Sequence, residues 1–290
     1  MSSPRGPLLV AGLFAASLTL LWSLPGRAAE PERVRVTGGS TTLPGLMYKP
    51  AGTGPFPAVV ALHGCGGLFD KAGKPDARTE DWGNRLAGQG FVVLFPDSFG
   101  PRGVSNQCRT RERVARSSRE RRADAHAARR WLQHQGFVKP EAINLMGWSN
   151  GGSSVLYAVR KERLSRPGRG VRVIGPDFAR AVAFYPGCRV PADKGRFQSR
   201  MPLMILIGEA DDWTPARYCQ ALATQTKGSP FPVTFVGYPG AYHDFDWPDR
   251  PVTVLKGLAF AAGGGGEAHS GTDAAARADA IEKATAFLAR

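Results

Sequence analysis

Six short apolar runs, separated by segments with helical periodicity, constrain the fold of this chain more than any other feature. Runs of this kind, each followed by a helical pattern, are typical of a parallel sheet whose strands are joined by crossover helices. The runs are Pro57 to Leu62, Phe91 to Phe95, Ala142 to Met146, Ala181 to Tyr185, Leu203 to Ile207 and Val233 to Tyr238. The sequence therefore predicts an α/β fold with a mostly parallel central sheet and helices on both faces.

The remaining segments complete this expected architecture. Arg33 to Val36 and Gly45 to Tyr48 predict an antiparallel edge of the sheet. The predicted helices are Thr79 to Ala87, Arg111 to Gln135, Gly151 to Arg160, Pro215 to Thr226 and Ala274 to Leu288. The basic segment Lys161 to Pro176 predicts a surface insertion, and Ala261 to Asp273, with four consecutive glycines, predicts a flexible link.

The first 29 residues have the pattern of a signal peptide. Arg5 precedes an apolar run from Leu8 to Leu24, and small residues stand at a cleavage site near Ala28 or Ala29. An uncleaved membrane anchor is the alternative, because the run is close to the shortest length that spans a bilayer. We expect residues 30–290 to form one domain of an extracytoplasmic protein, either periplasmic or secreted.

Four cysteines fit export, because an even number of them in an oxidising compartment allows two disulfides. Three pairings are open. We favour Cys65 with Cys108 and Cys188 with Cys219, since each pair would link loops at the same end of the sheet. No C-x-x-C pattern or histidine cluster is present, so we expect no metal site.

The formal charge of +14 comes largely from arginines between Arg109 and Arg130. Apolar positions in this stretch form one stripe, which predicts a helix with arginines on its solvated face. A second interpretation is that the basic face makes weak contact with anionic cell-envelope polymers or steers acidic substrates. Binding to nucleic acid is not expected, because no recognition motif accompanies the charge.

The strongest local signal is the sequence GWSNGG, from Gly147 to Gly152, directly after an apolar run and before a helical segment. A G-x-S-x-G motif between a strand and a helix predicts a sharp turn that exposes the serine hydroxyl. Ser149 is therefore the candidate nucleophile.

A serine hydroxyl becomes a good nucleophile only when a base removes its proton, which usually requires a histidine. Only His243 lies in the loop directly after the last predicted strand, the position at which a base would follow serine and acid in chain order. The other four are less suitably placed, next to a glycine-rich turn, in the basic helix or in the glycine-rich link: His63, His126, His134 and His269.

The acid that orients this histidine is expected after the run Leu203 to Ile207, in the sequence GEADDWTP. We favour Asp211, which lies three residues after Gly208 and four before Pro215. Asp212 remains the alternative, and the aspartate that is not used would cap the following helix.

Two backbone N–H groups are candidates for stabilising the oxyanion of the transition state. One belongs to Asn150, directly after the nucleophile. The other belongs to the glycine-rich turn after Leu62, where we favour Cys65 over Gly66.

Taken together, these segments resemble the dienelactone hydrolase family of α/β-hydrolases from about Arg33 onward. The resemblance rests on six motifs in the family's order: LHGCGG at 62–67, FPDSFG at 95–100, GWSNGG at 147–152, FYPGC at 184–188, GEADDWTP at 208–215 and GAYHDFD at 240–246. It implies the α/β-hydrolase fold, with Ser149, Asp211 and His243 as the catalytic triad.

The chain also departs from the members that open dienelactone. They have a cysteine where Ser149 stands and an acidic residue where His63 stands. They bind the substrate carboxylate with arginines, one of them just after the catalytic histidine, where this chain has Asp246 and Trp247. Arg102 remains as a candidate anion contact, and the serine indicates a general carboxylesterase.

The expected reaction is acyl transfer from a small ester to water, without a metal or an organic cofactor. Trp148, Trp213, Tyr242 and Phe245 are candidates for lining the acyl pocket. Thioester or amide cleavage by the same groups stays open, as does a non-catalytic protein that binds an anionic polymer. The sequence does not indicate an oligomeric state.

Overall fold

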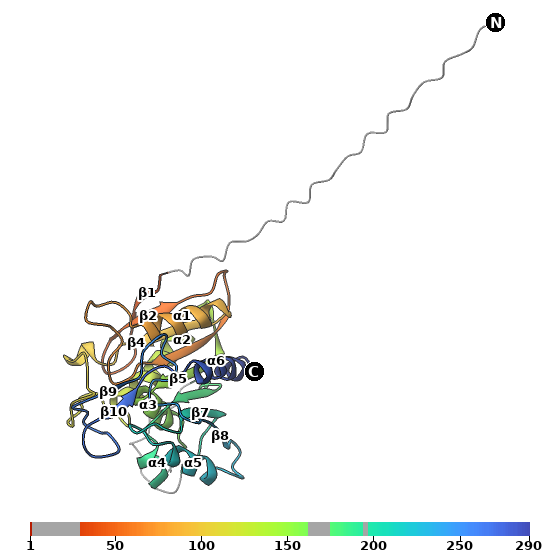
Figure 1. Ribbon diagram of the computed structural model, residues 1–290. Coiled ribbons are helices and arrows are strands. Elements are labelled where there is room, and N and C mark those ends of the chain that lie inside the picture. Colours follow the sequence, from red (N-terminus) through yellow and green to blue (C-terminus); the bar gives the residue numbers. More distant parts are fainter. Residues whose placement is uncertain (2–29, 162–174, 194–196) are drawn as a thin grey trace.

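An eight-stranded sheet organises the protein (Figure 1). The computed structural model describes residue 1 and residues 30–161, 175–193 and 197–290. The strands of the sheet are β1 (Glu32–Val36), β2 (Leu43–Tyr48), β3 (Phe56–Leu62), β4 (Val92–Pro96), β5 (Val138–Trp148), β6 (Ala181–Phe184), β7 (Leu203–Gly208) and β8 (Val233–Tyr238). Their order is β1-β2-β4-β3-β5-β6-β7-β8.

Strand direction divides this sheet into two parts. Pairing is parallel from β4 through β8, whereas β1 pairs antiparallel with β2, and β2 pairs antiparallel with β4. The predicted parallel sheet with an antiparallel edge is confirmed. Every residue of β4, β6 and β7 is buried, as expected for strands covered on both faces.

Helices flank the sheet: α1 (Ala77–Gly88), α2 (Glu120–Gln133), α3 (Asn150–Val159), α4 (Arg189–Asp193), α5 (Ala216–Gln225) and α6 (Ala274–Leu288), with a 3₁₀ turn η1 (Gly100–Arg102). An ion pair between Asp81 and Arg277 joins α1 to α6, while α2 packs on α3. The candidate site residues lie on the connections that follow β3, β5, β7 and β8. Because these strands are parallel, those four connections meet at one edge of the sheet.

The helix predicted from Arg111 to Gln135 begins nine residues later, at Glu120, so the first part of that prediction is wrong. The side-chain amide of the buried Gln107 pairs with the backbone of Ala115, donating to its carbonyl at 3.2 Å and accepting from its N–H at 3.1 Å. The Glu120 carboxylate accepts a hydrogen bond from the Arg116 N–H at 3.0 Å. These bonds satisfy the backbone groups that a longer helix would use.

The prediction of a solvated arginine face on this helix is also wrong for three residues. Arg121 and Arg129 are fully buried, and Arg122 is nearly so. The guanidinium groups of Arg121 and Arg129 donate hydrogen bonds to backbone carbonyls, His63 O and Pro176 O respectively. Such bonds offset part of the cost of removing a cation from water.

The segment predicted as a flexible link, Ala261 to Asp273, contains a strand. β10 (Ala268–Ser270) pairs antiparallel with β9 (Thr253–Leu255), a strand that the sequence patterns missed. The Asp212 carboxylate accepts a hydrogen bond from the His269 N–H at 2.8 Å and fixes this hairpin beside the β7 connection. The pairing with β9 and the hydrogen bond to Asp212 therefore give this segment a regular structure.

Two other predictions fall mostly or wholly on residues that are not described. The signal-peptide prediction concerns residues 1–29, of which 2–29 lie outside the described residues, and the predicted insertion at 161–176 includes 162–174. Within the described part of the chain, no helix is long and apolar enough to cross a membrane.

The structure pairs the four cysteines as favoured from the sequence. Cys65 is bonded to Cys108, and Cys188 to Cys219, each with a Cα separation of 5.0 Å. The first disulfide ties the loop after β3 to the segment that precedes α2. The second ties α5 to the loop after β6.

Candidate active site

Ser149 occupies a strained turn between β5 and α3. Its backbone has φ 52° and ψ −114°, a conformation that costs of the order of 1–3 kcal/mol for a residue with a Cβ. A Cβ on Gly147 would lie 2.7 Å from the carbonyl carbon of Gly151, and one on Gly151 would collide with the carbonyl oxygen of Leu62. The two glycines therefore let strand and helix approach closely enough to form the turn.

His243 lies between Ser149 and Asp211 in an almost fully buried arrangement. Its Nε2 is 2.9 Å from Ser149 Oγ, and its Nδ1 is 2.7 Å from Asp211 Oδ2. Asp211 follows β7 and His243 follows β8, so parallel neighbouring strands deliver both side chains. The Asp211 carboxylate also accepts hydrogen bonds from the N–H groups of Trp213 and Thr214, at 2.9 and 2.7 Å.

The electrostatic surroundings of His243 favour its protonated form. Burial alone lowers the pKa of the imidazole, but the charge of Asp211 and its hydrogen bond outweigh burial, so that the pKa of His243 is raised above its ordinary value. A group with this pKa accepts a proton readily from a neighbouring hydroxyl.

Asp212, the alternative acid, is engaged elsewhere. Its Oδ1 accepts from the His269 N–H, and its Oδ2 is 2.8 Å from His269 Nδ1. Of the two adjacent aspartates, Asp211 contacts His243, and Asp212 holds the β9–β10 hairpin.

The candidate oxyanion donors lie on the two elements that meet at Ser149. Asn150 is the first residue of α3, where helix N–H groups lack partners within the helix. Cys65, in the turn after β3, lines the same cleft as Ser149. A Cβ on its neighbour Gly64 would lie 3.8 Å from the Cβ of Ser149, so this turn passes close to the candidate nucleophile.

Arg121 joins these two elements from inside the protein, a role that sequence reasoning missed. Its Nη1 donates to Asn150 Oδ1, and its Nη2 donates to the carbonyl oxygen of His63, both at 2.6 Å. The side chain is fully buried. Nothing in the sequence distinguished Arg121 from the arginines around it.

A second buried network supports the loop that carries His243. Arg78 donates to Asp244 Oδ1 at 2.8 Å and to the hydroxyl of Tyr185 at 2.7 Å. Burial raises the pKa of Asp244, but the charge of Arg78 outweighs burial and lowers it well below the ordinary value. Asp244 therefore stays ionised beside the histidine and keeps the loop anchored to α1.

Asp246 joins the same network at a fully buried position. Its carboxylate accepts hydrogen bonds from the indole N–H groups of Trp82 and Trp148 at 2.8 and 2.7 Å, and from the Tyr185 hydroxyl at 2.5 Å. Burial raises the pKa of Asp246 above the ordinary value. The indole contact explains why Trp148 points into the core.

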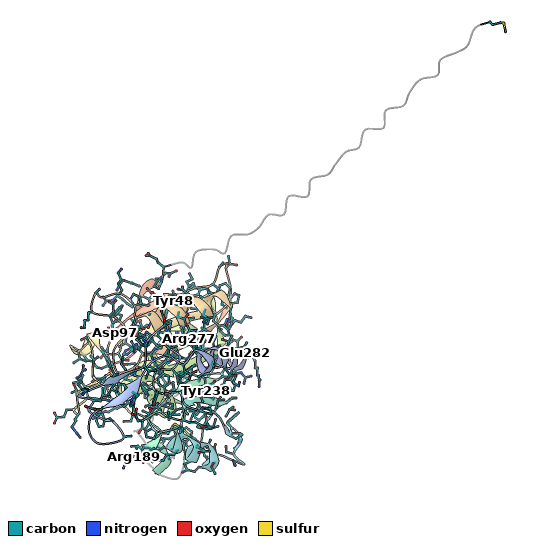
Figure 2. All side chains as sticks on the ribbon, in the orientation of Figure 1. Tyr48, Asp97, Arg189, Tyr238, Arg277 and Glu282 are labelled. Atoms are coloured by element: carbon teal, nitrogen blue, oxygen red, sulfur yellow. A yellow bond between two sulfur atoms is a disulfide. The ribbon has the colours of Figure 1, made fainter. Side chains whose placement is uncertain are left out.

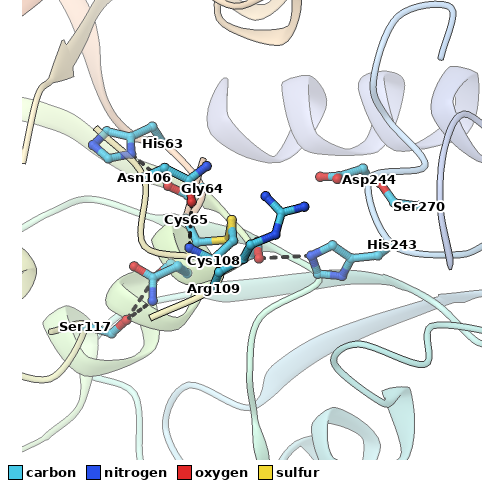
Figure 3. Close-up of a disulfide and its surroundings, with 12 residues drawn as sticks. His63, Gly64, Cys65, Asn106, Cys108, Arg109, Ser117, His243, Asp244 and Ser270 are labelled. Carbon is cyan, nitrogen blue, oxygen red and sulfur yellow. Dashed lines mark hydrogen bonds between the residues drawn. A yellow bond between two sulfur atoms is a disulfide. The ribbon is translucent and has the colours of Figure 1, made fainter. Parts of the chain in front are cut away.

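A cleft of about 1470 Å³ opens above Ser149. Its walls come from the segment before α2, the N-terminal ends of α4 and α5, and the loop between β9 and β10. Figure 3 shows the Cys65–Cys108 disulfide with Arg109 next to it, and a dashed line from the His243 imidazole marks its hydrogen bond. Within the described residues, no group of three or more potential metal ligands is found.

Residues 43–290 match the model of the dienelactone hydrolase family. The chain belongs to this family. No relative among the curated proteins matches it.

Solved structures of similar fold are also found. A putative dienelactone hydrolase from Klebsiella pneumoniae aligns with a TM-score of 0.63 and 15% identity, covering 90% of this chain and 98% of the other. Esterase 2 of Thermogutta terrifontis, solved with propionate bound, aligns with a TM-score of 0.63 and 21% identity, covering 91% and 96%. At these identities the likeness shows the α/β-hydrolase fold.

Within this family fold, Arg102 does not serve as the expected anion contact. Its guanidinium makes a two-pronged ion pair with Asp124 at 2.8 and 2.9 Å and donates to the Ser98 carbonyl at 2.6 Å. Arg102 does not line the cleft that contains Ser149. Its charge is neutralised inside the protein, so that expectation is wrong.

Only one of the four aromatic residues predicted to line the pocket does so. Trp213 lines the cleft, with its ring centroid 4.6 Å from that of His243. Trp148 and Phe245 are buried in the core, and Tyr242 stacks on His269 at 4.7 Å. Trp148 is directed inward because it is the last residue of the buried strand β5.

Proposed function

We propose that this member of the dienelactone hydrolase family is a serine hydrolase that cleaves carboxylic esters through an acyl-enzyme at Ser149. The observation that carries the proposal is the continuous chain of contacts from Ser149 Oγ through His243 to Asp211, at 2.9 and 2.7 Å. These groups lie at a strained turn beneath a large cleft, as nucleophilic catalysis requires.

In the first half of the reaction, Ser149 Oγ attacks the ester carbonyl carbon while His243 Nε2 takes the hydroxyl proton. The tetrahedral intermediate collapses as the ester C–O bond breaks, and His243 returns the proton to the leaving alcohol. Water then attacks the acyl-enzyme, again losing a proton to His243, which passes it to Ser149 when the acid leaves. Asp211 holds the imidazole and stabilises its charged form.

An oxyanion forms in both halves of the reaction, and we assign its stabilisation to the backbone N–H groups of Cys65 and Asn150. Arg121 supports the proposal because it holds the His63 carbonyl and the Asn150 side chain in place with two hydrogen bonds. Donors fixed before the reaction need no rearrangement when the charge develops.

We assign the protein to an extracytoplasmic compartment, reached through a signal peptide within residues 1–29. The two disulfides support this assignment, because such bonds persist mainly in oxidising compartments.

The experiment is hydrolysis of a short-chain p-nitrophenyl ester by the wild type and matched variants. We expect Ser149→Ala and Asp211→Asn each to lose roughly three orders of magnitude or more in kcat. Asp212→Asn is the control for Asp211→Asn, and we expect it to lose less than about tenfold, since Asp212 contacts His269.

Equal losses in the two aspartate variants would contradict the assignment of Asp211. Absence of turnover in the wild type, together with binding of anionic polymer that persists in Ser149→Ala, would instead favour a non-catalytic binding protein. Faster turnover of a thioester or amide than of the matched ester would change the substrate but leave the catalytic groups in place.

A further inference from the structure

We infer that the natural substrate of this site is an acidic polysaccharide that carries ester groups, bound along its length across the mouth of the cleft. The inference rests on the proposed hydrolase function and names the substrate class of the same site. It is carried by the distribution of charge around Ser149.

Arginines dominate the ionisable side chains at the cleft mouth. Among the described residues that line the cleft, six are arginines and one, Glu112, carries a carboxylate. These arginines are Arg109, Arg111, Arg113, Arg116, Arg189 and Arg217. Of these, Arg116 makes a close ion pair with Glu120 at 2.6 Å.

The cations come from two separate parts of the chain. Four belong to the segment between Cys108 and α2, whereas Arg189 begins α4 and Arg217 lies in the first turn of α5. In Figure 1 the yellow segment before α2 lies apart from α4 and α5, and Figure 2 labels Arg189 at the lower margin of the molecule. A substrate that meets both groups must extend across the cleft on both sides of its ester.

The contacts of three of these arginines, Arg109, Arg113 and Arg217, leave their charges available. Arg109 donates to the Lys256 carbonyl at 3.1 Å, Arg113 lies over the ring of Phe260, and Arg217 lies over the ring of Tyr218. Within the described residues, none of these three makes an ion pair with a carboxylate. Clustered cations repel one another, so an external polyanion that neutralises them would be bound favourably.

Apolar side chains stand among these cations at the mouth. Val114, Val190 and Phe260 line the cleft, and each is 49% exposed. Exposed apolar groups close to a site are typical of ligand contact. A chain of sugar rings presents apolar ring faces between its carboxylates, which fits this alternation of charge and apolar surface.

The magnitude of surface ion pairs argues for a polymer over a small anion. One exposed pair contributes only about 0–1 kcal/mol, so a single carboxylate at the rim would gain little. When several carboxylates belong to one polymer, binding of the first to an arginine holds the others close to the remaining arginines. The polymer therefore binds more tightly than a single carboxylate does. Arg102, which the sequence suggested as a contact for a small anion, is ion-paired with Asp124.

The test compares three substrates of the full-length protein at low and high salt: acetylated polygalacturonate, acetylated xylan as the neutral polymer, and p-nitrophenyl acetate. We expect kcat/KM for the acidic polymer to exceed that for the neutral polymer by roughly tenfold or more at low salt, and the preference to disappear at high salt.

The variant is Arg109→Gln combined with Arg217→Gln, which removes one cation from each side. We expect the ratio of kcat/KM for the acidic polymer to that for p-nitrophenyl acetate to fall about tenfold. The control is Arg35→Gln, an exposed arginine on β1, which should leave this ratio unchanged.

Equal hydrolysis of the two polymers, or a preference that does not depend on salt, would overturn the inference while leaving the ester hydrolase intact. A monomeric anionic ester favoured over its neutral analogue as strongly as the polymer would also overturn it. Failure of the wild-type protein to hydrolyse p-nitrophenyl acetate would show that the proposed function itself is wrong.

Discussion

The two halves of the arginine-rich stretch place the same residue type in opposite surroundings. In residues 109–119 the chain is irregular, and four of its five arginines line the cleft. In α2, Arg121 and Arg129 are fully buried and bonded to backbone carbonyls. The buried arginines bind the protein's own backbone, whereas those that line the cleft are the ones that we infer bind the substrate.

The comparison shows that net charge is a poor guide to the role of an arginine. Both halves contribute to the formal charge of +14. In the buried half, a planar guanidinium offers several donors in a fixed fork, which is what two carbonyl oxygens need. In the exposed half, the same cation contributes to a positive electrostatic potential at the surface, which attracts anions.

The largest effect expected from this comparison concerns Arg121. We expect Arg121→Met to lower kcat for a small ester roughly 10- to 100-fold, less than the loss of an oxyanion donor itself, because Arg121 positions the donors without contacting the substrate. KM should change little. Arg119→Gln, which removes an arginine that is 75% exposed, serves as the control and should have less than a twofold effect.

A purely structural role for Arg121 would lower the melting temperature without this kinetic change. Affinity for a trifluoromethyl ketone that mimics the oxyanion should fall in proportion to kcat/KM. Arg121→Lys keeps the charge but loses the planar guanidinium that donates to two oxygens at once. Full activity in that variant would contradict the positioning role of Arg121.

The next largest effect concerns the disulfide that ties the start of the exposed segment to the turn after β3. Cys108 begins the exposed segment, and Cys65 is a proposed oxyanion donor. We expect Cys108→Ser to lower kcat about three- to tenfold, because the turn after β3 loses its outer anchor. Cys219→Ser removes the other disulfide, which ties α5 to the loop after β6 and not to this turn, and should leave kcat within about twofold.

Both cysteine variants should lose about 2–4 kcal/mol of unfolding free energy, since the loops that they open are similar, at 43 and 31 residues. Their activities are therefore compared well below both melting temperatures. An equal loss of kcat in the two variants would show that the effect is one of stability alone.

The smallest effect is a shift in the pH profile. Arginines of both regions stay charged throughout the acid range, so the acid limb reports His243. Because the pKa of His243 is raised, activity should be full above that pKa and be lost as the pH falls through it, at a higher pH than for an ordinary histidine. Asp211→Asn should move the midpoint of its residual activity to lower pH. A rate that stays flat down to pH 4 would exclude a histidine base.

Much of the fold followed from local patterns. The predicted bounds of β8 and α6 agree with the structure, because Pro232 and Pro239 flank β8 and Asp273 caps the start of α6. Ser149, Asp211 and His243 were selected by chain order and strand ends, and the structure brings them within hydrogen-bond distance.

The errors arose where contacts between distant residues decide the structure. The start of α2 depends on the Gln107 side chain, and β10 depends on β9 and on Asp212. Neither contact leaves a periodic signal. The burial of Arg121 was equally hidden, because the carbonyl that it binds lies 58 positions earlier in the chain.

The most direct test of the central claim is to find which residue a fluorophosphonate modifies in the intact, disulfide-bonded protein. After stoichiometric labelling and digestion, mass spectrometry should locate the adduct on Ser149, and prior acylation by a slow ester substrate should prevent labelling. An adduct on another residue, or none under conditions in which the ester is hydrolysed, would contradict the assignment of Ser149 as the nucleophile.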